Sequence, residues 1–134
     1  MLEKTKILVC DRSLLSVNIL NLLLKRPDFQ YEHLSSFQNL EALKSLLLQS
    51  HVVFLNANVL PNYFETVFKV FCDDARSRAL PKFLFLEEGQ QEQYAALRDI
   101  PHLEFIFRPF YPADFAKRVS AFLPSERRDA HANN

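Results

Sequence analysis

The sequence contains a single glycine, Gly89, among its 134 residues. Loops that cradle phosphate groups need several glycines, because their backbone must approach the anion closely and adopt positive φ angles. One glycine cannot build the fingerprint of a dinucleotide-binding fold or a Walker loop. Nucleotide hydrolysis and dinucleotide redox chemistry are therefore poor interpretations of this chain.

Cysteine is almost as scarce, since only Cys10 and Cys72 occur. Neither has a histidine or a second cysteine at metal-ligand spacing, and the two lie far apart in the sequence. We therefore expect no disulfide framework, no metal site and no cofactor. Cys10 lies in an apolar run, where a small buried side chain is its expected role.

The sequence also lacks an excess of either charge, because 16 Lys and Arg balance 16 Asp and Glu. A neutral molecule has no overall electrostatic attraction for nucleic acid or for an acidic membrane. No apolar run reaches the roughly 18 residues of a membrane span, and no basic, apolar leader is visible. We expect a cytoplasmic protein whose partner is another protein, with no direct contact to nucleic acid or membrane.

What the sequence has in abundance is apolar residues, which make up 49% of the chain and include 13 phenylalanines. Apolar runs typical of buried strands alternate with segments of helical periodicity. Strands are expected at 6–10, 29–35, 51–56, 82–86 and 103–107. Helices are expected at 11–26, 37–49, 61–78, within 87–100 and at 112–123. In the first, Ser13 is the expected N-cap and Pro27 the residue that stops the helix. In the helix over 61–78, Pro61 fits the first turn.

This order predicts an α/β fold with a five-stranded parallel sheet, doubly wound as a three-layer sandwich. Residues 1–124 are expected to form one domain. Residues 125–134 have no apolar periodicity, so a disordered tail or a linker to an effector domain is expected there.

Polar side chains gather where the predicted strands end, which is the edge at which doubly wound sheets bind ligands. Asp11 and Arg12 follow the first strand and Asn56 ends the third. Glu87 and Glu88 follow the fourth strand, and Arg108 and Pro109 follow the fifth.

The segments ILVCDRS, HVVFLNANVLP, LPKFLFLEE and FIFRPF resemble the four landmark segments of two-component receiver domains, which are CheY-like. Their order and spacing cover residues 5–123. FRPF is similar to the Lys-Pro-Phe of that family, and Phe105 matches its aromatic position on the fifth strand. The resemblance implies a flavodoxin-like fold and a cis peptide bond between Arg108 and Pro109.

The chemistry of the family does not carry over to the matching positions. Two acidic residues hold Mg²⁺ in receivers, whereas this sequence has Asp11 followed by Arg12. The phosphate-accepting aspartate is matched by Asn56, or by Ala57 if the register shifts by one. The family's Ser or Thr falls on Leu86, or on Glu87 if shifted, and its lysine falls on Arg108.

The charge of such a pocket differs from that of the family. Three carboxylates and one lysine give a receiver pocket a charge near −2, whereas one acid, two arginines and an amide give near +1 here. Mg²⁺ needs carboxylate oxygens to compensate for its lost hydration. We expect Arg12 or Arg108 to occupy the place of the metal and to pair with Asp11, and also with Glu87.

Asn56 has two interpretations. Asparagine is a common residue at the end of a strand, where it favours a turn. Together with Arg12, Leu86 and Arg108, however, it indicates a receiver that has lost its phosphorylation site, because a neutral amide is not a nucleophile for phosphoryl transfer.

Two surfaces are candidates for protein contacts. The segment 61–78 carries more large apolar residues than one helix stripe can bury, so Tyr63 and Val70 lie either at the surface or in a broad core face. Receivers also form homodimers through their fourth helix, fifth strand and fifth helix. The resemblance places Tyr94, Leu97, Phe105 and Tyr111 on that face.

The resemblance implies a pseudo-receiver that is not phosphorylated. Its expected role is as an interaction or dimerisation module in bacterial signal transduction or transcription regulation, and we expect it to form a homodimer. The alternative is a domain of the same fold that senses an anion or nucleotide through Arg12 and Arg108. An enzyme is the weakest interpretation, because Ser13 has no histidine partner and the edge offers no nucleophile–base pair.

Overall fold

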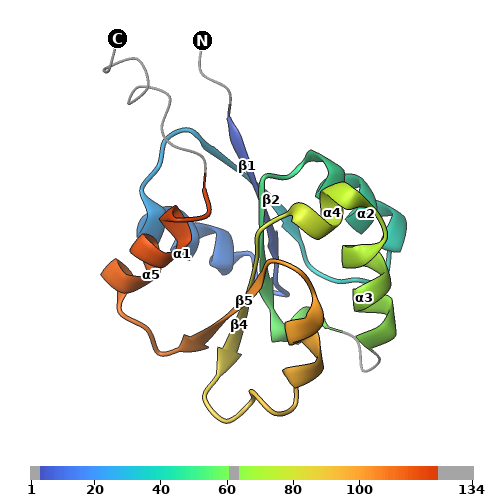
Figure 1. The fold of residues 1–134 in the computed structure, drawn as a ribbon. Coiled ribbons are helices and arrows are strands. Elements are labelled where there is room, and N and C mark those ends of the chain that lie inside the picture. The colour runs from blue at the N-terminus through green and yellow to red at the C-terminus, as the bar shows by residue number, and fades with distance from the viewer. Residues whose placement is uncertain (1–3, 61–63, 124–134) are drawn as a thin grey trace.

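The computed structural model describes residues 4–60 and 64–123, which form a five-stranded sheet between two helical layers (Figure 1). The strands are β1 (Thr5–Cys10), β2 (Phe29–Leu34), β3 (Val52–Asn56), β4 (Lys82–Glu87) and β5 (Leu103–Arg108). They are all parallel and lie in the order β2-β1-β3-β4-β5. This is the predicted fold class.

One face of the sheet is covered by α1 (Leu15–Leu24) and α5 (Pro112–Ser120), and the other by α2 (Leu40–Gln49), α3 (Phe64–Cys72) and α4 (Ala75–Ala79) (Figure 1). Side chains of one strand alternate between the two faces. In β1, for example, Ile7 and Val9 pack toward α1 and α5, whereas Leu8 and Cys10 pack toward α2 and α3. Because both faces are buried, the middle parts of the central strands are apolar, as the sequence indicated.

The predicted helix over 61–78 is divided into α3 and α4 at Asp73 and Asp74. Asp74 adopts an extended conformation, and its side chain accepts a hydrogen bond of 2.8 Å from the backbone N–H of Ser77. Asp74 therefore begins a new helix, as expected for an aspartate N-cap. Val70 is buried, so the broad core face is the correct interpretation at that position, while Pro61 and Tyr63 lie outside the described residues.

Two other helix predictions also need correction. The segment 87–100 forms only a short 3₁₀ helix, η2 (Ala95–Asp99), after a turn in which Gly89 adopts a φ of +94°. Its weak apolar periodicity explains why no longer helix forms. The N-cap of α1 is Leu14 and not Ser13, although the Ser13 hydroxyl does accept a hydrogen bond from the N–H of Leu15.

Lys82, the first residue of β4, is completely buried at the edge of the sheet opposite to Asp11 and Asn56. Its ammonium group donates to the backbone carbonyls of Arg78, Leu80 and Pro101 at 3.3, 2.8 and 3.0 Å. Burial lowers the pKa of Lys82 to about 8, so the amine is still mostly protonated at neutral pH. It joins the end of α4 to the segment that precedes β5.

Replacement of Lys82 by methionine is expected to lower the free energy of unfolding by about 2–3 kcal/mol at pH 7, because three carbonyl groups lose their charged donor. Urea denaturation measures this change, with Lys69→Met on the exposed side of α3 as control. A more stable Lys82→Met variant would contradict the account, since burial of the ammonium would then cost more than its hydrogen bonds contribute.

Candidate functional site at the carboxyl edge of the sheet

The carboxyl ends of β1 and β3 meet at the centre of the sheet, where the chain order reverses. Asp11 directly follows β1, and Asn56 is the last residue of β3. The short 3₁₀ helix η1 (Ala57–Val59) then places Asn58 beside them. Doubly wound sheets of this strand order bind ligands at this position. The structure therefore brings Asp11 and Asn56 together as the sequence predicted.

The Asp11 carboxylate is buried and accepts four hydrogen bonds. Oδ1 accepts from the backbone N–H of Ser13 at 2.9 Å and from Nδ2 of Asn58 at 3.0 Å. Oδ2 accepts from Nδ2 of Asn56 at 2.9 Å and from the Ser16 hydroxyl. Each oxygen thus has two donors, which is close to the full capacity of a carboxylate. We call these five residues, Asp11, Ser13, Ser16, Asn56 and Asn58, the Asp11 ring.

Each of the two side-chain amides in the Asp11 ring donates a hydrogen bond through its nitrogen and accepts one through its oxygen. Oδ1 of Asn56 accepts from the backbone N–H of Asn58 at 3.2 Å and so caps η1. Oδ1 of Asn58 accepts from the backbone N–H of Arg12, also at 3.2 Å. A carboxylate at either position could accept these bonds but could not donate to Asp11. Asn56 therefore acts as a turn residue and as a partner of Asp11 at once.

The backbone of Asp11 is held as well as its side chain. Nε2 of His33, near the end of β2, lies 2.7 Å from the carbonyl oxygen of Asp11. The backbone N–H of Asp11 donates to the carbonyl of Leu34. The ends of β1, β2 and β3 are therefore linked through one residue.

The hydrogen bonds of the ring determine the charge state of Asp11. Burial alone would raise the pKa of this carboxyl group, but the bonds from Ser13, Ser16, Asn58 and Asn56 together outweigh it, and the pKa lies below its ordinary value. Asp11 is therefore an anion at neutral pH, stabilised by neutral donors.

Neither arginine takes the place expected for it. The Arg12 side chain is exposed and makes no bond to Asp11 within the described part of the chain. Arg108 instead pairs with Glu87, its neighbour across β4 and β5, with Nη1 at 3.0 Å from Oε1. Its guanidinium also lies over the ring of Phe85, 5.2 Å from the centroid. The predicted contact between Arg108 and Glu87 is present, whereas the predicted pairing of a guanidinium with Asp11 is wrong.

A cavity of about 360 Å³ opens beside the Asp11 ring, between α1 and the connection from β5 to α5. Its walls are largely apolar, and Arg108 is the cationic residue among those that line it. The lining residues are Asp11, Ser13, Leu15, Ser16, Ile19, Leu20, Leu23, Asn56, Asn58, Phe85, Arg108 and Phe110. Three of the predicted pocket residues, Asp11, Asn56 and Arg108, therefore line one cavity.

The other predicted pocket residues lie elsewhere. Arg12 lines a separate hollow with Ser35, Ser36 and neighbouring residues. Leu86 is buried in the core on the α2 and α3 side of the sheet, so its side chain does not reach the cavity. Pro109 is exposed, and the Arg108–Pro109 peptide bond is cis as expected.

The donors of this edge do not fit a divalent cation. Mg²⁺ prefers carboxylate oxygens and keeps an octahedral shell. Among the residues that line the cavity, Asp11 is the one carboxylate; each of its oxygens already accepts two hydrogen bonds, and the amide groups direct N–H donors toward it. No group of three or more His, Cys, Asp or Glu residues within 4–60 and 64–123 is placed to hold a metal ion.

Sequence reasoning missed Ser16, Asn58, Phe85 and Phe110. Ser16 and Asn58 had a usable signal, because Ser16 stands five residues after Asp11 and Asn58 stands two residues after Asn56. The two phenylalanines carried no distinct signal, since apolar residues at such positions usually belong to the core.

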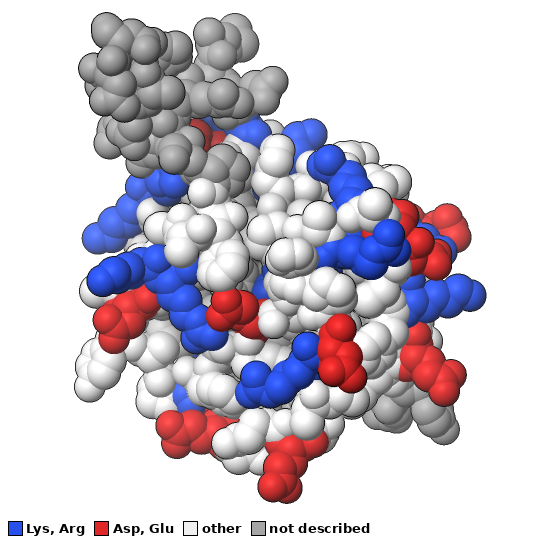
Figure 2. Space-filling model, viewed as in Figure 1, with Lys and Arg blue, Asp and Glu red and all other residues white. Residues whose placement is uncertain are grey.

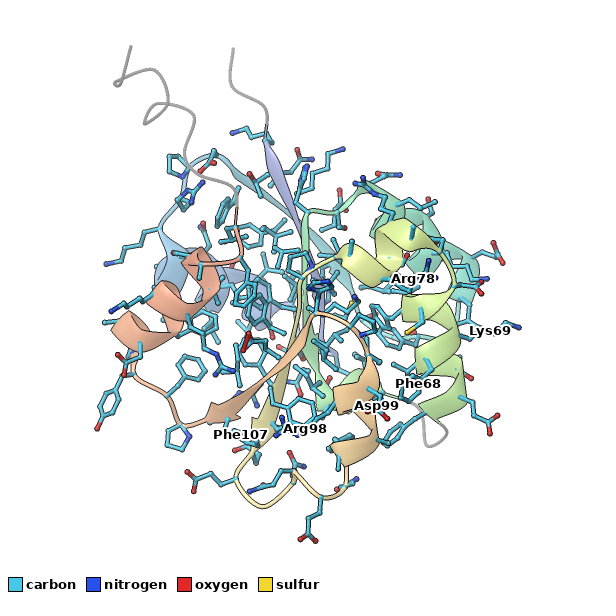
Figure 3. The ribbon with its side chains drawn as sticks, viewed as in Figure 1. Phe68, Lys69, Arg78, Arg98, Asp99 and Phe107 are labelled. Carbon is cyan, nitrogen blue, oxygen red and sulfur yellow. The ribbon has the colours of Figure 1, made fainter. Side chains whose placement is uncertain are left out.

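The predicted contact face, made here by η2, β5 and α5, is mostly internal. Tyr94, Leu97 and Phe105 are buried, and only Tyr111 is exposed. The surface there carries charged residues instead: Arg98 extends from η2 toward β5, near Phe107 (Figure 3), and lies over the ring of Phe105. Charges of both signs are interspersed over the visible side of the molecule (Figure 2). A homodimer through this face stays a prediction.

Solved structures of receiver domains share this fold. A receiver domain protein from Bacillus halodurans C-125 aligns with a TM-score of 0.68 and 8% identity, covering 92% of this chain and 100% of that one. The receiver domain of a signal transduction histidine kinase from Syntrophus aciditrophicus gives 0.68 and 17%, covering 92% and 96%. Vibrio cholerae CheY4 gives 0.66 and 16%, covering 90% and 99%.

These likenesses establish the receiver fold for this chain at the level of architecture. No protein-family model matches the sequence, and no curated protein matches it. No helix in the described part of the chain is long and apolar enough to cross a membrane.

Replacement of Asp11 by asparagine is expected to cost about 2 kcal/mol of stability at pH 7, because donors of the Asp11 ring lose a charged acceptor. The folded-state pKa of Asp11 is depressed, so its contribution is complete above pH about 4 and declines as the pH falls below that value. Urea denaturation of both proteins over a range of pH measures the difference, with Asp99→Asn on exposed η2 as control. A difference that did not shrink in acid would contradict the assignment.

Proposed function

We propose that the chain is a pseudo-receiver, a domain with the receiver fold that acts as a protein interaction module without being phosphorylated. The observation that carries this proposal is the bond from Nδ2 of Asn56 to Oδ2 of Asp11. At the position that the family uses to accept phosphate, this chain has a hydrogen-bond donor. The bond joins that position to the remaining carboxylate.

The chemistry of the Asp11 ring supports this function in two ways. The lone pair of an amide nitrogen is delocalised, so Asn56 cannot attack a phosphorus atom. Asp11 is buried under four donors, and a metal that used its oxygens would have to break bonds that also hold η1 and the start of α1. The edge is thereby kept in one arrangement by its own side chains.

The fold and the chemistry of the Asp11 ring support a role as an interaction module. Solved structures with this fold include receiver domains of response regulators and of a histidine kinase. A domain of this kind without a phosphate switch can still position a partner or its own effector domain in signal transduction or transcription regulation.

Substitution of Asn56 by aspartate tests the loss of the metal site. In the absence of metal, the variant is expected to lose about 1–3 kcal/mol of stability, because a donor to Asp11 becomes a like charge. Millimolar Mg²⁺ should raise the melting temperature of the variant and leave that of the wild type unchanged.

Gln30→Glu is a matched control, because it adds the same charge at an exposed position of β2. Stabilisation of the wild type by Mg²⁺ to the same extent as the Asn56→Asp variant would contradict the proposal.

The cavity beside the Asp11 ring favours a second candidate, which is the sensing of a small anionic ligand with an apolar body. Arg108 forms an ion pair with Glu87 and lines the cavity, whose walls are otherwise largely apolar. Binding sites for small molecules combine such walls with a few polar groups. Arg12 lines a different hollow, so this candidate rests on Arg108 alone.

Thermal denaturation with octanoate or with ATP as probe distinguishes this candidate. A sensing domain should be stabilised by one of the probes, and Arg108→Gln should abolish the effect. Glu87→Gln, which removes the competing carboxylate, should enhance it. Melting temperatures that do not change with either probe would exclude these two ligand classes.

A further inference from the structure

Helix α1 combines strong exposure with a complete lack of charge. None of its ten residues, LSVNILNLLL, is acidic or basic. Leu14, Leu15, Ile19 and Leu22 are 61, 65, 54 and 71% exposed, although each is a large apolar side chain. Together they offer on the order of several hundred Å² of apolar surface, about the largest patch that a soluble monomer usually exposes. Depletion of charge with apolar enrichment is the signature of an interface core.

The spacing of the exposed residues is that of a helix–helix contact. Leu15, Ile19 and Leu22 stand at i, i+4 and i+7, so they form one line along the exposed side of α1, where Leu15 and Ile19 also border the cavity beside the Asp11 ring. The inner side of the helix is already used, because Leu20 is buried against the sheet, with Val17 and Leu24 packed beside it. The exposed line has the same spacing as the seam of a two-stranded coiled coil.

The exposed line is also complementary to itself. A leucine stands on each side of Ile19, four residues before it and three residues after it. When two copies meet antiparallel about a two-fold axis, Ile19 faces its own copy and Leu15 faces Leu22 of the other. No charge on the helix opposes this contact, and isologous interfaces require such self-complementarity. Exposed Asn18 and Asn21 border the line with neutral polar groups.

We infer that two copies of this chain associate through the Leu15–Ile19–Leu22 line of α1, packed antiparallel. This assignment differs from the face made by η2, β5 and α5, where Arg98, Glu104 and Arg118 lie at the surface and Phe105 is buried.

The inference rests on the proposed function, because the start of α1 is held by the Asp11 ring. The N–H of Ser13 and the hydroxyl of Ser16, in the first turn, both donate to the Asp11 carboxylate. The position of the exposed line is therefore set by side-chain bonds within the chain. A dimer formed in this way needs no phosphate signal.

Sedimentation of the full chain over a range of concentrations tests the association. The wild type should show a monomer–dimer equilibrium. Ile19→Glu and Leu22→Glu should each raise the dimer dissociation constant by roughly tenfold or more, because a carboxylate would be buried in an apolar seam. Leu48→Glu is the matched control on α2, where the leucine is 51% exposed, and it should leave the equilibrium unchanged. Circular dichroism verifies that all three variants fold.

Cross-linking tests the antiparallel geometry independently of dimer affinity. With Cys72 replaced by serine, an Ile19→Cys variant should form a disulfide-linked dimer rapidly on oxidation with diamide, because residue 19 faces itself. A Leu22→Cys variant should react much more slowly alone and rapidly when mixed with a Leu15→Cys variant. Equal self-linking of the Ile19→Cys and Leu22→Cys variants would overturn the antiparallel arrangement.

The outcomes separate this inference from the proposed function. A wild type that is monomeric at all concentrations, or a dimer that all α1 variants retain, overturns the α1 interface and leaves the pseudo-receiver proposal intact. A dimer that appears only with Mg²⁺ and beryllofluoride overturns both, because association would then depend on phosphate chemistry. A dimer present without them and weakened only by the α1 substitutions supports both.

Discussion

The Asp11 carboxylate is the group on which the arrangement of this domain edge depends. It is buried, ionised and surrounded by neutral donors from the start of α1 and from the end of β3. A buried anion is costly unless its oxygens are hydrogen-bonded, and here each oxygen has two donors. The residues of the Asp11 ring are therefore coupled, because the loss of any one donor leaves a charged acceptor less satisfied.

This coupling explains why amides stand at two positions of the edge. Asn56 and Asn58 each donate to the carboxylate and accept from a backbone N–H. An aspartate would supply acceptors only and would add a like charge beside Asp11. In the function proposed here, an amide at the position of the phosphate-accepting aspartate removes a nucleophile and also supplies a donor. In the same interpretation, a charge that receiver domains balance with a metal ion is balanced here by hydrogen bonds from the chain itself.

The sequence was sufficient for the architecture because apolar runs and helical periodicity report burial directly. The five strands, their buried faces and the position of Asn56 at the end of β3 follow from such patterns. The break between α3 and α4 was missed because it depends on a local competition, in which the Asp74 side chain caps a new helix. The segment that ends in η2 was predicted to carry a short helix, and its weak apolar pattern explains why only a 3₁₀ helix forms there.

The site was harder to predict, because a count of charges does not say in which direction a side chain points or how far it extends. Two arginines near one aspartate suggested an ion pair, yet Arg12 points to solvent and Arg108 bonds Glu87 on the neighbouring strand. The actual partners of Asp11 are neutral residues close in sequence to Asp11 itself or to Asn56, and their contribution depends on backbone turns. Likewise, the exposure of α1 could not be read from a helix whose residues are nearly all apolar.

An amide NMR titration of the full chain with Mg²⁺ and then beryllofluoride, which mimics a phosphorylated aspartate, tests the central claim most directly. The account predicts that the resonances of Asp11, Asn56, Asn58 and Arg108 do not shift, because the Asp11 ring already occupies the oxygens that a metal would need. Saturable shifts at these residues would show that this edge of the sheet still binds Mg²⁺ and a phosphate mimic, and they would contradict the account.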